Sequence, residues 1–258
     1  MAQIALMRAV SPSLGQCELT FLAREAIDLD RARAQHRALE RALETLGCVV
    51  ERLPAEPDLP DSVFVEDTVV VVDEVAVVTR PGAPSRRAET ESVARALARY
   101  RPLVPIEAPG TLEGGDVLRL GPRVFVGRST RTNEAGIEGL RAALSGFGYS
   151  VTAVPVSGCL HLKSAVTEIA PGTVLLNPEW VDAAAFPGAT IIEVDPDEPF
   201  AANAQRVGDA VVFPAAFPRT AERLRGLGIP IVTIDLSELA RAEGAVTCCS
   251  VVFESARG

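Results

Sequence analysis

The sequence predicts an α/β fold in which five similar units close into a ring. Three observations lead to this prediction: a strand–turn–strand–helix–strand pattern recurs, tight turns join the first two strands of each unit, and the chain ends supply one further unit. Short turns join antiparallel strands, whereas parallel strands need long crossovers. A doubly wound parallel sheet is therefore the less favoured alternative.

Four copies of the pattern follow one another along the chain. Their turns are centred near residues 73, 121, 171 and 208, which are 48, 50 and 37 residues apart. Each turn contains glycine, proline or an acidic pair, as tight turns require. Helical spacing of apolar residues follows in ESVARALARY, NEAGIEGLRAALSGFG and RTAERLRGLG, while the third copy has only a short helical piece around WVDAAAF.

The two ends of the chain supply a fifth unit. The final segment TCCSVVFES predicts a strand, and the N-terminal part contributes the strand IALMRAV and the helix DLDRARAQHRALERALETLG. Pairing the last strand with this material closes the ring and removes free sheet edges. We therefore expect a single α/β domain over residues 1–258, made of about five ββαβ-like units around a pseudosymmetry axis.

Charge and composition restrict the partners. The chain carries 25 Lys and Arg against 34 Asp and Glu, a net charge of −9. An acidic surface repels phosphate backbones and anionic lipids, so we expect no nucleic-acid or membrane partner and favour a small cationic ligand. No apolar run is long enough for a membrane helix, and no signal peptide is recognisable. Five cysteines, an odd number, predict reduced thiols in the cytoplasm.

The segments just before the first strand of each unit carry the reactive residue types. They read FVED (64–67), LEGGD (112–116), CLHLK (159–163), AAN (201–203) and TCC (247–249). Equivalent positions of a pseudosymmetric ring converge at one end of its axis, so carboxylates, a histidine and a cysteine would meet there. That combination is typical of an enzyme with a thiol nucleophile, and we expect its catalytic domain to be the whole ring.

Each of these residues also has a purely structural interpretation. A cysteine in an apolar strand is most often a core residue, and strand alternation would turn Cys248 and Cys249 to opposite faces, so that only one reaches the pocket. His161 would then only end a strand. Gly114 and Gly115 would form a turn or bulge that lets the backbone approach closely.

A metal site is not predicted. Cys248, His161 and a carboxylate could bind an ion, but the chain has only two histidines and no CxxC or HxxxH spacing. The other histidine, His36, lies on a charged helical stretch and is expected at the surface without a partner. A zinc-dependent hydrolase stays open as an alternative that chelators would inactivate.

The motifs LPDSVFVED, TRPGAPSRR, LEGGDVL, VGRSTRTN, GCLHLKS and TCCS, with SLGQ near the N-terminus, resemble those of the dimethylarginine dimethylaminohydrolases. This family belongs to the guanidine-modifying (pentein) superfamily, and the matches span residues 59–250 in the family's order. The resemblance implies a five-fold α/β-propeller that hydrolyses methylated arginines to citrulline and an amine without a cofactor. It is compatible with a monomer or a homodimer.

The resemblance also implies roles for individual residues. Cys248 would be the nucleophile, His161 the general acid and base, and Glu113 the residue that orients His161. Substrate contacts are implied for six further residues: Leu14 in a mobile lid, Asp61 near the α-amino group, Glu66 and Asp67 at the guanidinium, and Arg86 and Arg131 at the α-carboxylate.

Four alternative functions remain open beside the methylarginine hydrolase and the zinc-dependent hydrolase. Arginine deiminases resemble this pattern but have an aspartate where this chain has Lys163, which leaves room for N-methyl groups and favours a methylated substrate. An amidinotransferase would use an amine in place of water. An agmatine deiminase would not need Arg86 and Arg131, because agmatine has no carboxylate. A non-catalytic propeller that only binds partners would have no reason to assemble Cys248, His161 and Glu113.

Overall fold

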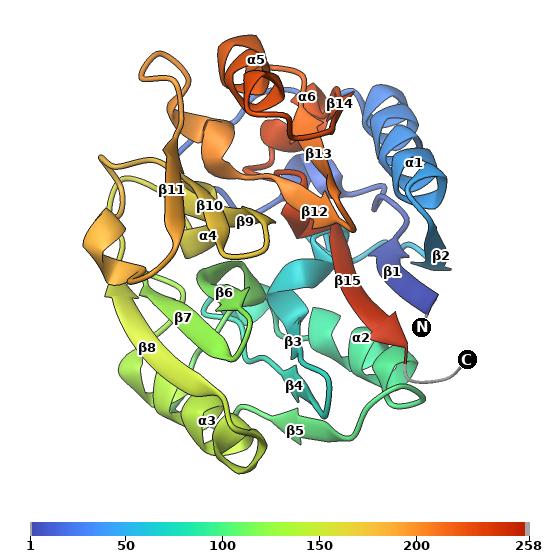
Figure 1. The fold of residues 1–258 in the computed structure, drawn as a ribbon. Helices are drawn as coiled ribbons and strands as arrows, with labels where there is room; N and C mark the ends of the chain where they lie inside the picture. The colour runs from blue at the N-terminus through green and yellow to red at the C-terminus, as the bar shows by residue number, and fades with distance from the viewer. Residues whose placement is uncertain (1, 256–258) are drawn as a thin grey trace.

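The five-unit ring is confirmed in the computed structural model, which describes residues 2–255 (Figure 1). Five three-stranded sheets surround a central axis, and each has the same strand arrangement. The first strand pairs antiparallel with the second, and the second pairs parallel with the third. Since a helical connection links the second and third strands in most units, the repeat is ββαβ, as predicted.

The four internal sheets follow the chain in order. Their strands are β3 (Val69–Val71), β4 (Ala76–Val78) and β5 (Leu103–Pro105); β6 (Val117–Leu120), β7 (Arg123–Arg128) and β8 (Ser150–Pro155); β9 (Val166–Ala170), β10 (Thr173–Leu176) and β11 (Thr190–Glu193); β12 (Gln205–Val207), β13 (Ala210–Pro214) and β14 (Ile231–Ile234). Three of the units carry a full crossover helix, namely α2 (Glu89–Leu97), α3 (Glu134–Leu144) and α5 (Pro218–Gly226). The third unit has only the 3₁₀ turn η6 (Ala183–Ala185).

The fifth sheet joins the two ends of the chain. Strand β15 (Ser250–Ser255) pairs antiparallel with β1 (Ala2–Arg8), and β1 pairs parallel with β2 (Cys48–Leu53). Helix α1 (Leu29–Thr45) provides the crossover, and the Asp28 side chain caps it by accepting from the N–H groups of Asp30 and Arg31. The predicted closure of the ring is therefore confirmed.

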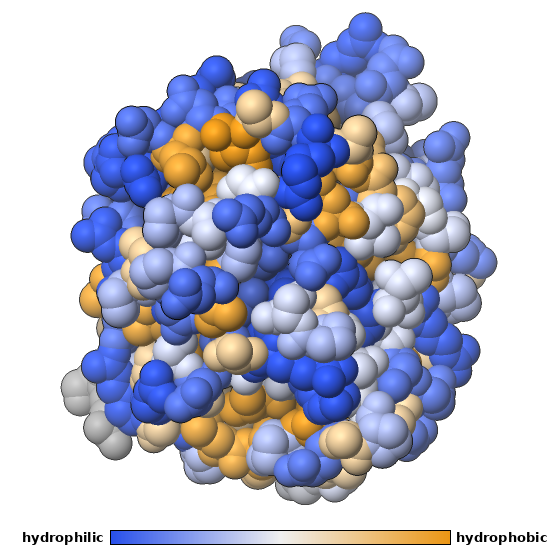
Figure 2. All heavy atoms as spheres, turned by 180° about the vertical axis from the view of Figure 1, so that it is seen from behind, coloured by the Kyte–Doolittle hydropathy of each residue, from blue (hydrophilic) through white to orange (hydrophobic). Residues whose placement is uncertain are grey.

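The first strands lie around the centre of the ring, and the longer helices lie on its outside (Figure 1). Five buried apolar clusters fill the space between sheets and helices. Figure 2 shows the opposite face, where apolar patches lie among polar side chains. Within residues 2–255, no helix is both long and apolar enough to cross a membrane.

The prediction for His36 is wrong. This side chain is only 2% exposed, and its Nδ1 lies 3.4 Å from Oε1 of Glu40, which also pairs with Arg52. Helix α1 is amphipathic, and Ala32, His36 and Leu39 lie on its buried face. The many charged residues on its other face led to the prediction of an exposed histidine.

A short helical turn precedes the first strand of every unit. These turns are η2 (Val65–Thr68), η4 (Gly114–Asp116), α4 (Leu162–Ala165), η7 (Pro199–Ala202) and η8 (Thr247–Cys249). Contacts run from η8 to η2, from η2 to η4, from η4 to α4 and from α4 to η7. The five segments singled out in the sequence therefore do meet around the axis.

Candidate active site

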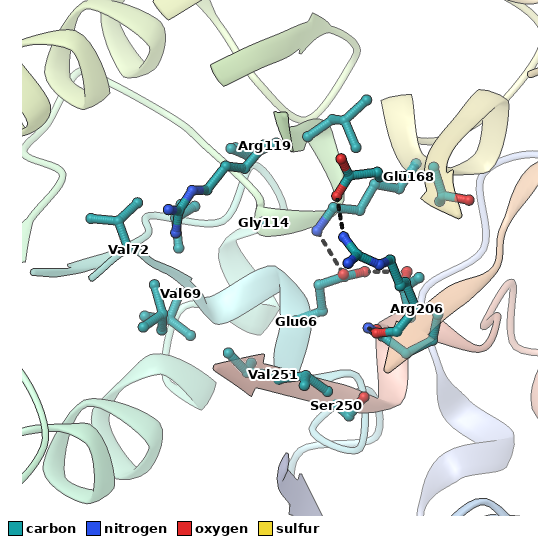
Figure 3. Close-up of a pocket in the computed structure, with 18 of the residues that line it drawn as sticks. Glu66, Val69, Val72, Gly114, Arg119, Glu168, Arg206, Ser250 and Val251 are labelled. Atoms are coloured by element: carbon teal, nitrogen blue, oxygen red, sulfur yellow. Dashed lines mark hydrogen bonds and ion pairs between the residues drawn. The ribbon is translucent and has the colours of Figure 1, made fainter. Parts of the chain in front are cut away.

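Adjacent residues of these turns face two different cavities. Glu66, Lys163 and Thr247 line a cavity of about 410 Å³, whereas Asp67, His161 and Cys248 line a smaller one of about 20 Å³. Figure 3 shows the larger cavity, where Glu66, Glu168 and Arg206 come together and Glu168 pairs with Arg206 at 3.2 Å. The full lining of the smaller cavity is Glu18, Asp61, Phe64, Asp67, Arg86, Arg131, Leu160, His161, Ala242, Glu243 and Cys248.

Cys248 lies in the middle of η8 and is the cysteine that reaches the smaller cavity. Its neighbour Cys249 is fully buried in the apolar core, with its Sγ 3.7 Å from the Ala245 carbonyl oxygen. The two thiols point in different directions because both residues belong to the turn η8, and not because they alternate along a strand as the sequence suggested. Desolvation raises the pKa of the Cys248 thiol, and the nearby negative charges of Glu66 and Asp67 raise it further. The unliganded protein therefore holds a neutral thiol.

His161 immediately precedes α4 and is tied to the neighbouring unit. Its Nε2 lies 2.7 Å from Oε2 of Glu113, and its Nδ1 lies 3.8 Å from Oδ1 of Asp67. Burial favours the neutral ring, but the negative charges of Asp67, Glu113 and Asp116 outweigh it and raise the pKa of His161 to about 9. Burial likewise favours neutral Glu113, yet its bond to His161 lowers the Glu113 pKa to about 2. At neutral pH the pair is ionised.

Asp116 holds the histidine turn in place, a role that the sequence did not reveal. It is fully buried, and its Oδ1 accepts from the backbone N–H of Leu162 at 3.0 Å. Its Oδ2 accepts from the hydroxyls of Ser129 and Thr132 at 2.6 and 2.7 Å. Because this carboxylate satisfies the first turn of α4, it fixes where His161 projects.

The paired glycines of LEGGD are required by close approach. A Cβ on Gly114 would lie 1.9 Å from the Glu66 carbonyl oxygen, and a Cβ on Gly115 would lie 2.7 Å from both Nδ1 of His161 and Oδ1 of Asp67. The N–H of Gly115 also donates to Asp67 at 3.1 Å. The expected close backbone approach around Glu113 is present.

Asp67 and Arg86 form a buried ion pair beside this cluster. Arg86 Nη1 donates to Asp67 Oδ2 at 2.7 Å, and Arg86 also pairs with Glu89 at 2.9 Å. Arg131 lies near the same group, with its Nη1 3.9 Å from Glu113 Oε1. All of the charged residues expected at the two ends of a substrate, except Glu66, therefore line the smaller cavity.

Glu66 differs from the expectation, because it faces the larger cavity. Its Oε1 accepts from Lys163 Nζ at 2.7 Å, and its Oε2 accepts from the Thr247 hydroxyl at 2.6 Å. Burial raises the pKa of Glu66, although Lys163 opposes this effect. Because Glu66 does not line the smaller cavity, Asp67 is the acid of the FVED motif that faces Cys248.

Leu14 also differs from the expectation. Its side chain is fully buried in the apolar core, and it does not line the smaller cavity. From the same N-terminal segment, Glu18 lines the cavity, and its backbone N–H donates to Oδ2 of Asp61 at 3.0 Å. The SLGQ motif indicated Leu14, but the residue that reaches the cavity is Glu18, four positions further along the chain.

One group of side chains among residues 2–255 has the spacing of a metal site. One donor atom each from Asp67, Glu113 and His161 lies within 4.8 Å of the others. These donors are also engaged with protein partners, since His161 bonds Glu113 and Arg86 pairs with Asp67. The same three residues can therefore serve as an acid, a base and a cation acceptor.

Comparison with known proteins assigns the family. A family model described as "N,N dimethylarginine dimethylhydrolase, eukaryotic" matches residues 19–185. The N(G),N(G)-dimethylarginine dimethylaminohydrolase of Streptomyces coelicolor is 45% identical over 249 residues, which cover 96% of this chain and 95% of the relative. This chain belongs to the dimethylarginine dimethylaminohydrolase family.

Solved structures agree with this membership. A dimethylarginine dimethylaminohydrolase from Pseudomonas aeruginosa, a cysteine-to-serine variant complexed with citrulline, superposes with a TM-score of 0.93 at 36% identity, covering 98% of this chain and all of that chain. The N-terminal domain of a cyanobacterial arginine dihydrolase has a TM-score of 0.89 at 19% identity, covering 99% and 98% of the two chains. The second likeness shows only that the two share a fold.

Proposed function

We propose that this family member hydrolyses Nω,Nω-dimethylarginine and Nω-monomethylarginine to citrulline and the corresponding amine. The observation that carries the proposal is a single cavity lined by a thiol, an imidazole, and side chains of both charges: Cys248, His161, Asp61, Asp67, Arg86 and Arg131. The citrulline complex of the Pseudomonas aeruginosa relative supports the product class.

The charges of the cavity match the two ends of the substrate. Asp67 already accepts a guanidinium hydrogen bond from Arg86, so its carboxylate has the geometry that a substrate guanidinium needs. Arg86 and Arg131 supply guanidinium forks for the α-carboxylate, and Asp61 supplies an acceptor for the α-ammonium group. This arrangement disfavours agmatine, because agmatine has no carboxylate to neutralise the arginines.

The first chemical step forms a covalent intermediate. The bound cation stabilises the thiolate and so lowers the pKa of the Cys248 thiol, which releases its proton to solvent. The resulting thiolate attacks the guanidinium carbon. A C–S bond forms and the C–N bond to dimethylamine breaks. His161, which is protonated at neutral pH, donates its proton to the leaving nitrogen. The product of this step is a thiouronium on Cys248.

The second step is hydrolysis. The now neutral His161 accepts a proton from water, which attacks the thiouronium carbon. Collapse breaks the C–S bond, and the hydroxyl proton passes to the departing sulfur, which releases citrulline and restores the Cys248 thiol. Glu113, bonded to Nε2, keeps the imidazole ring oriented and stabilises its charged form in both steps.

Lys163 supports a methylated substrate over unmethylated arginine. Its side chain lines the larger cavity and bonds Glu66 at 2.7 Å, so the position two residues after His161 adds no anion to the catalytic cavity for unmethylated guanidinium N–H groups. All five cysteines are free, in keeping with the proposed cytoplasmic location. The proposed partner is the small-molecule substrate, and the protein would act as a monomer or a homodimer.

The test measures citrulline and amine release from dimethylarginine, arginine and agmatine. We expect dimethylamine and citrulline from dimethylarginine, with the rate reduced at least about 10³-fold in Cys248→Ser. Cys249→Ser is the matched control, since this neighbouring thiol lies in the core, and it should keep activity. Ammonia release from arginine alone would replace the proposal with arginine deiminase activity.

A further inference from the structure

The catalytic cavity is too small for its proposed substrate in this structure. Its volume of about 20 Å³ is roughly that of one water molecule, whereas small-molecule sites usually offer about 300 Å³ or more. Part of the lining must therefore move when the substrate enters. A candidate with few backbone connections is the segment of residues 18–22, which follows η1 (Leu14–Gln16) and contributes Glu18 to the cavity.

Side-chain carboxylates hold this segment in place. Among the described residues, no backbone–backbone hydrogen bond involves residues 18–22. Glu243 accepts from three consecutive backbone N–H groups instead: Thr20 at 3.0 Å, Phe21 at 2.6 Å and Leu22 at 2.7 Å. Successive N–H groups that converge on one anion form a strong anion-binding arrangement.

Apolar packing accounts for only one residue of the segment, the partly buried Leu19, which lies against the core. The Phe21 and Leu22 side chains are 51% and 43% exposed, on the rim of a mainly apolar hollow of about 320 Å³. Charge-assisted bonds to Glu243 are therefore the main attachment of the segment.

The backbone of Glu243 provides a second, independent observation. Its φ of +56° is the only positive φ at a non-glycine residue among residues 2–255. Side chains other than glycine, asparagine and aspartate are disfavoured there, and such strain marks positions where a side chain has a task. Cys248 lies five residues after Glu243 in the chain. Glu243 therefore connects the segment of residues 18–22 to the η8 turn that carries Cys248.

We propose that Glu243 is a positioning residue that holds residues 18–22 closed over the catalytic cavity. Closure is coupled to the substrate because two of the three other anchors are predicted substrate contacts; the third is the Ser85 hydroxyl, which donates to Glu18 Oε1 at 2.6 Å. Arg131 Nη2 donates to the Thr20 hydroxyl at 2.9 Å, and Asp61 accepts from the Glu18 N–H. A substrate that engages Arg131 and Asp61 must rearrange these two anchors, while Glu243 keeps the segment near its closed position. This coupling rests on the proposed function.

The test combines three measurements on Glu243→Gly, which suits the positive φ but removes the carboxylate. Hydrogen exchange of the Thr20, Phe21 and Leu22 amides should quicken about tenfold or more, because local opening governs their protection. Alkylation of Cys248 by iodoacetamide should quicken by a similar factor of about ten, since opening exposes the thiol. The KM for dimethylarginine should rise about tenfold with a smaller change in kcat.

Two further variants distinguish the loss of the Glu243 contacts to residues 18–22 from a general loss of stability. Glu243→Gln keeps an acceptor oxygen and should fall between wild type and Glu243→Gly in all three measurements. Glu25→Gln is the matched control: Glu25 lies in the same part of the chain, is exposed and pairs only with Arg241 at 3.5 Å among the described residues, so it should resemble wild type.

The outcomes distinguish the two proposals. Unchanged amide exchange and alkylation in Glu243→Gly would contradict the proposed role of Glu243, whatever the activity of the variant. If exchange and alkylation are faster in Glu243→Gly but the wild type does not turn over dimethylarginine, the role of Glu243 is supported and the proposed function is wrong.

Discussion

At the scale of single residues, the site depends on the absence of a side chain as much as on reactive groups. Gly115 leaves room for the His161 ring on one side and receives the Asp67 carboxylate on its N–H. The sequence predicted a close backbone approach here. It could not predict what approaches, because that depends on the neighbouring unit.

Gly115→Ala should therefore impair catalysis without unfolding the protein. The added Cβ would lie 2.7 Å from His161 Nδ1, so the ring must shift, and a displacement of about 1 Å can cost roughly 10²-fold in rate. Steady-state kinetics on dimethylarginine, with the thermal midpoint as a check on folding, measure this effect. Gly146→Ala is the control, because a Cβ there has no neighbour within 4 Å. A Gly115→Ala enzyme with wild-type kcat would show that the ring tolerates the displacement.

Residue identities were predictable where a motif sets them, and their surroundings were not. Cys248, His161 and Glu113 come from short motifs far apart in the chain, and the structure brings His161 and Glu113 to 2.7 Å. Glu243 carried no sequence signal, since its distinguishing features are a backbone angle and three N–H partners. Leu14 was misplaced because a motif match does not say which residue of a loop reaches the cavity.

At the scale of elements, each turn divides its residues between two cavities. In η2 and η8, adjacent residues face opposite ways, so that Glu66 and Thr247 bond each other while Asp67 and Cys248 line the catalytic cavity. The sequence predicted that the turns meet on the axis. It could not predict this division, because the orientation of a one-turn helix depends on its contacts with neighbouring turns.

The turns η4 and α4 are joined by the ionised Glu113–His161 pair, which makes stability depend on pH. The folded-state pKa of His161 is raised to about 9, so its contribution is complete below the unfolded value of about 6.5 and is lost as pH rises toward 9. The folded-state pKa of Glu113 is lowered to about 2, so its contribution is present above about pH 4.5 and is lost as pH falls toward 2.

Removing the charge of Glu113 tests this linkage. Near pH 6, Glu113→Gln should lower the free energy of unfolding by about 2 kcal/mol, because His161 loses its buried counter-charge. The difference from wild type should shrink between pH 6.5 and 8.5, as measured by urea unfolding. Glu44→Gln, an exposed carboxylate on α1, should follow wild type throughout. A difference that stays constant with pH would contradict an ionised pair.

At the scale of the whole molecule, the ring is closed by non-covalent pairing of the chain ends. Ala2 lies opposite Ser255, and the pairing continues to Met7 opposite Ser250. Arg101, at the end of the α2 region, also donates to the Glu254 carbonyl oxygen at 2.6 Å. The recurrence of the unit was sufficient to predict this closure, because four internal units leave a strand at the C-terminus and a strand with a helix at the N-terminus.

Closure by pairing predicts that the ring tolerates new chain ends away from the catalytic cavity. Because Ala2 lies opposite Ser255, a short Gly/Ser linker should join the two ends of the chain, and new ends can be opened in the β12–β13 turn at Gly208 (Figure 1). This permutant should unfold cooperatively and keep dimethylarginine turnover within about tenfold of wild type.

Two other rearrangements should fail for different reasons. A chain that lacks residues 250–258 leaves β1 without its antiparallel partner and exposes a sheet edge, so it should lose cooperative unfolding and activity together. A permutant opened between Gly114 and Gly115 keeps all five sheets but cuts the turn that orients Glu113, so it should fold and lose activity. If the truncated chain instead unfolded cooperatively near the wild-type midpoint, β15 would not be needed to close the ring. Stability would then reside in the separate units, and only catalysis would depend on their arrangement around the axis.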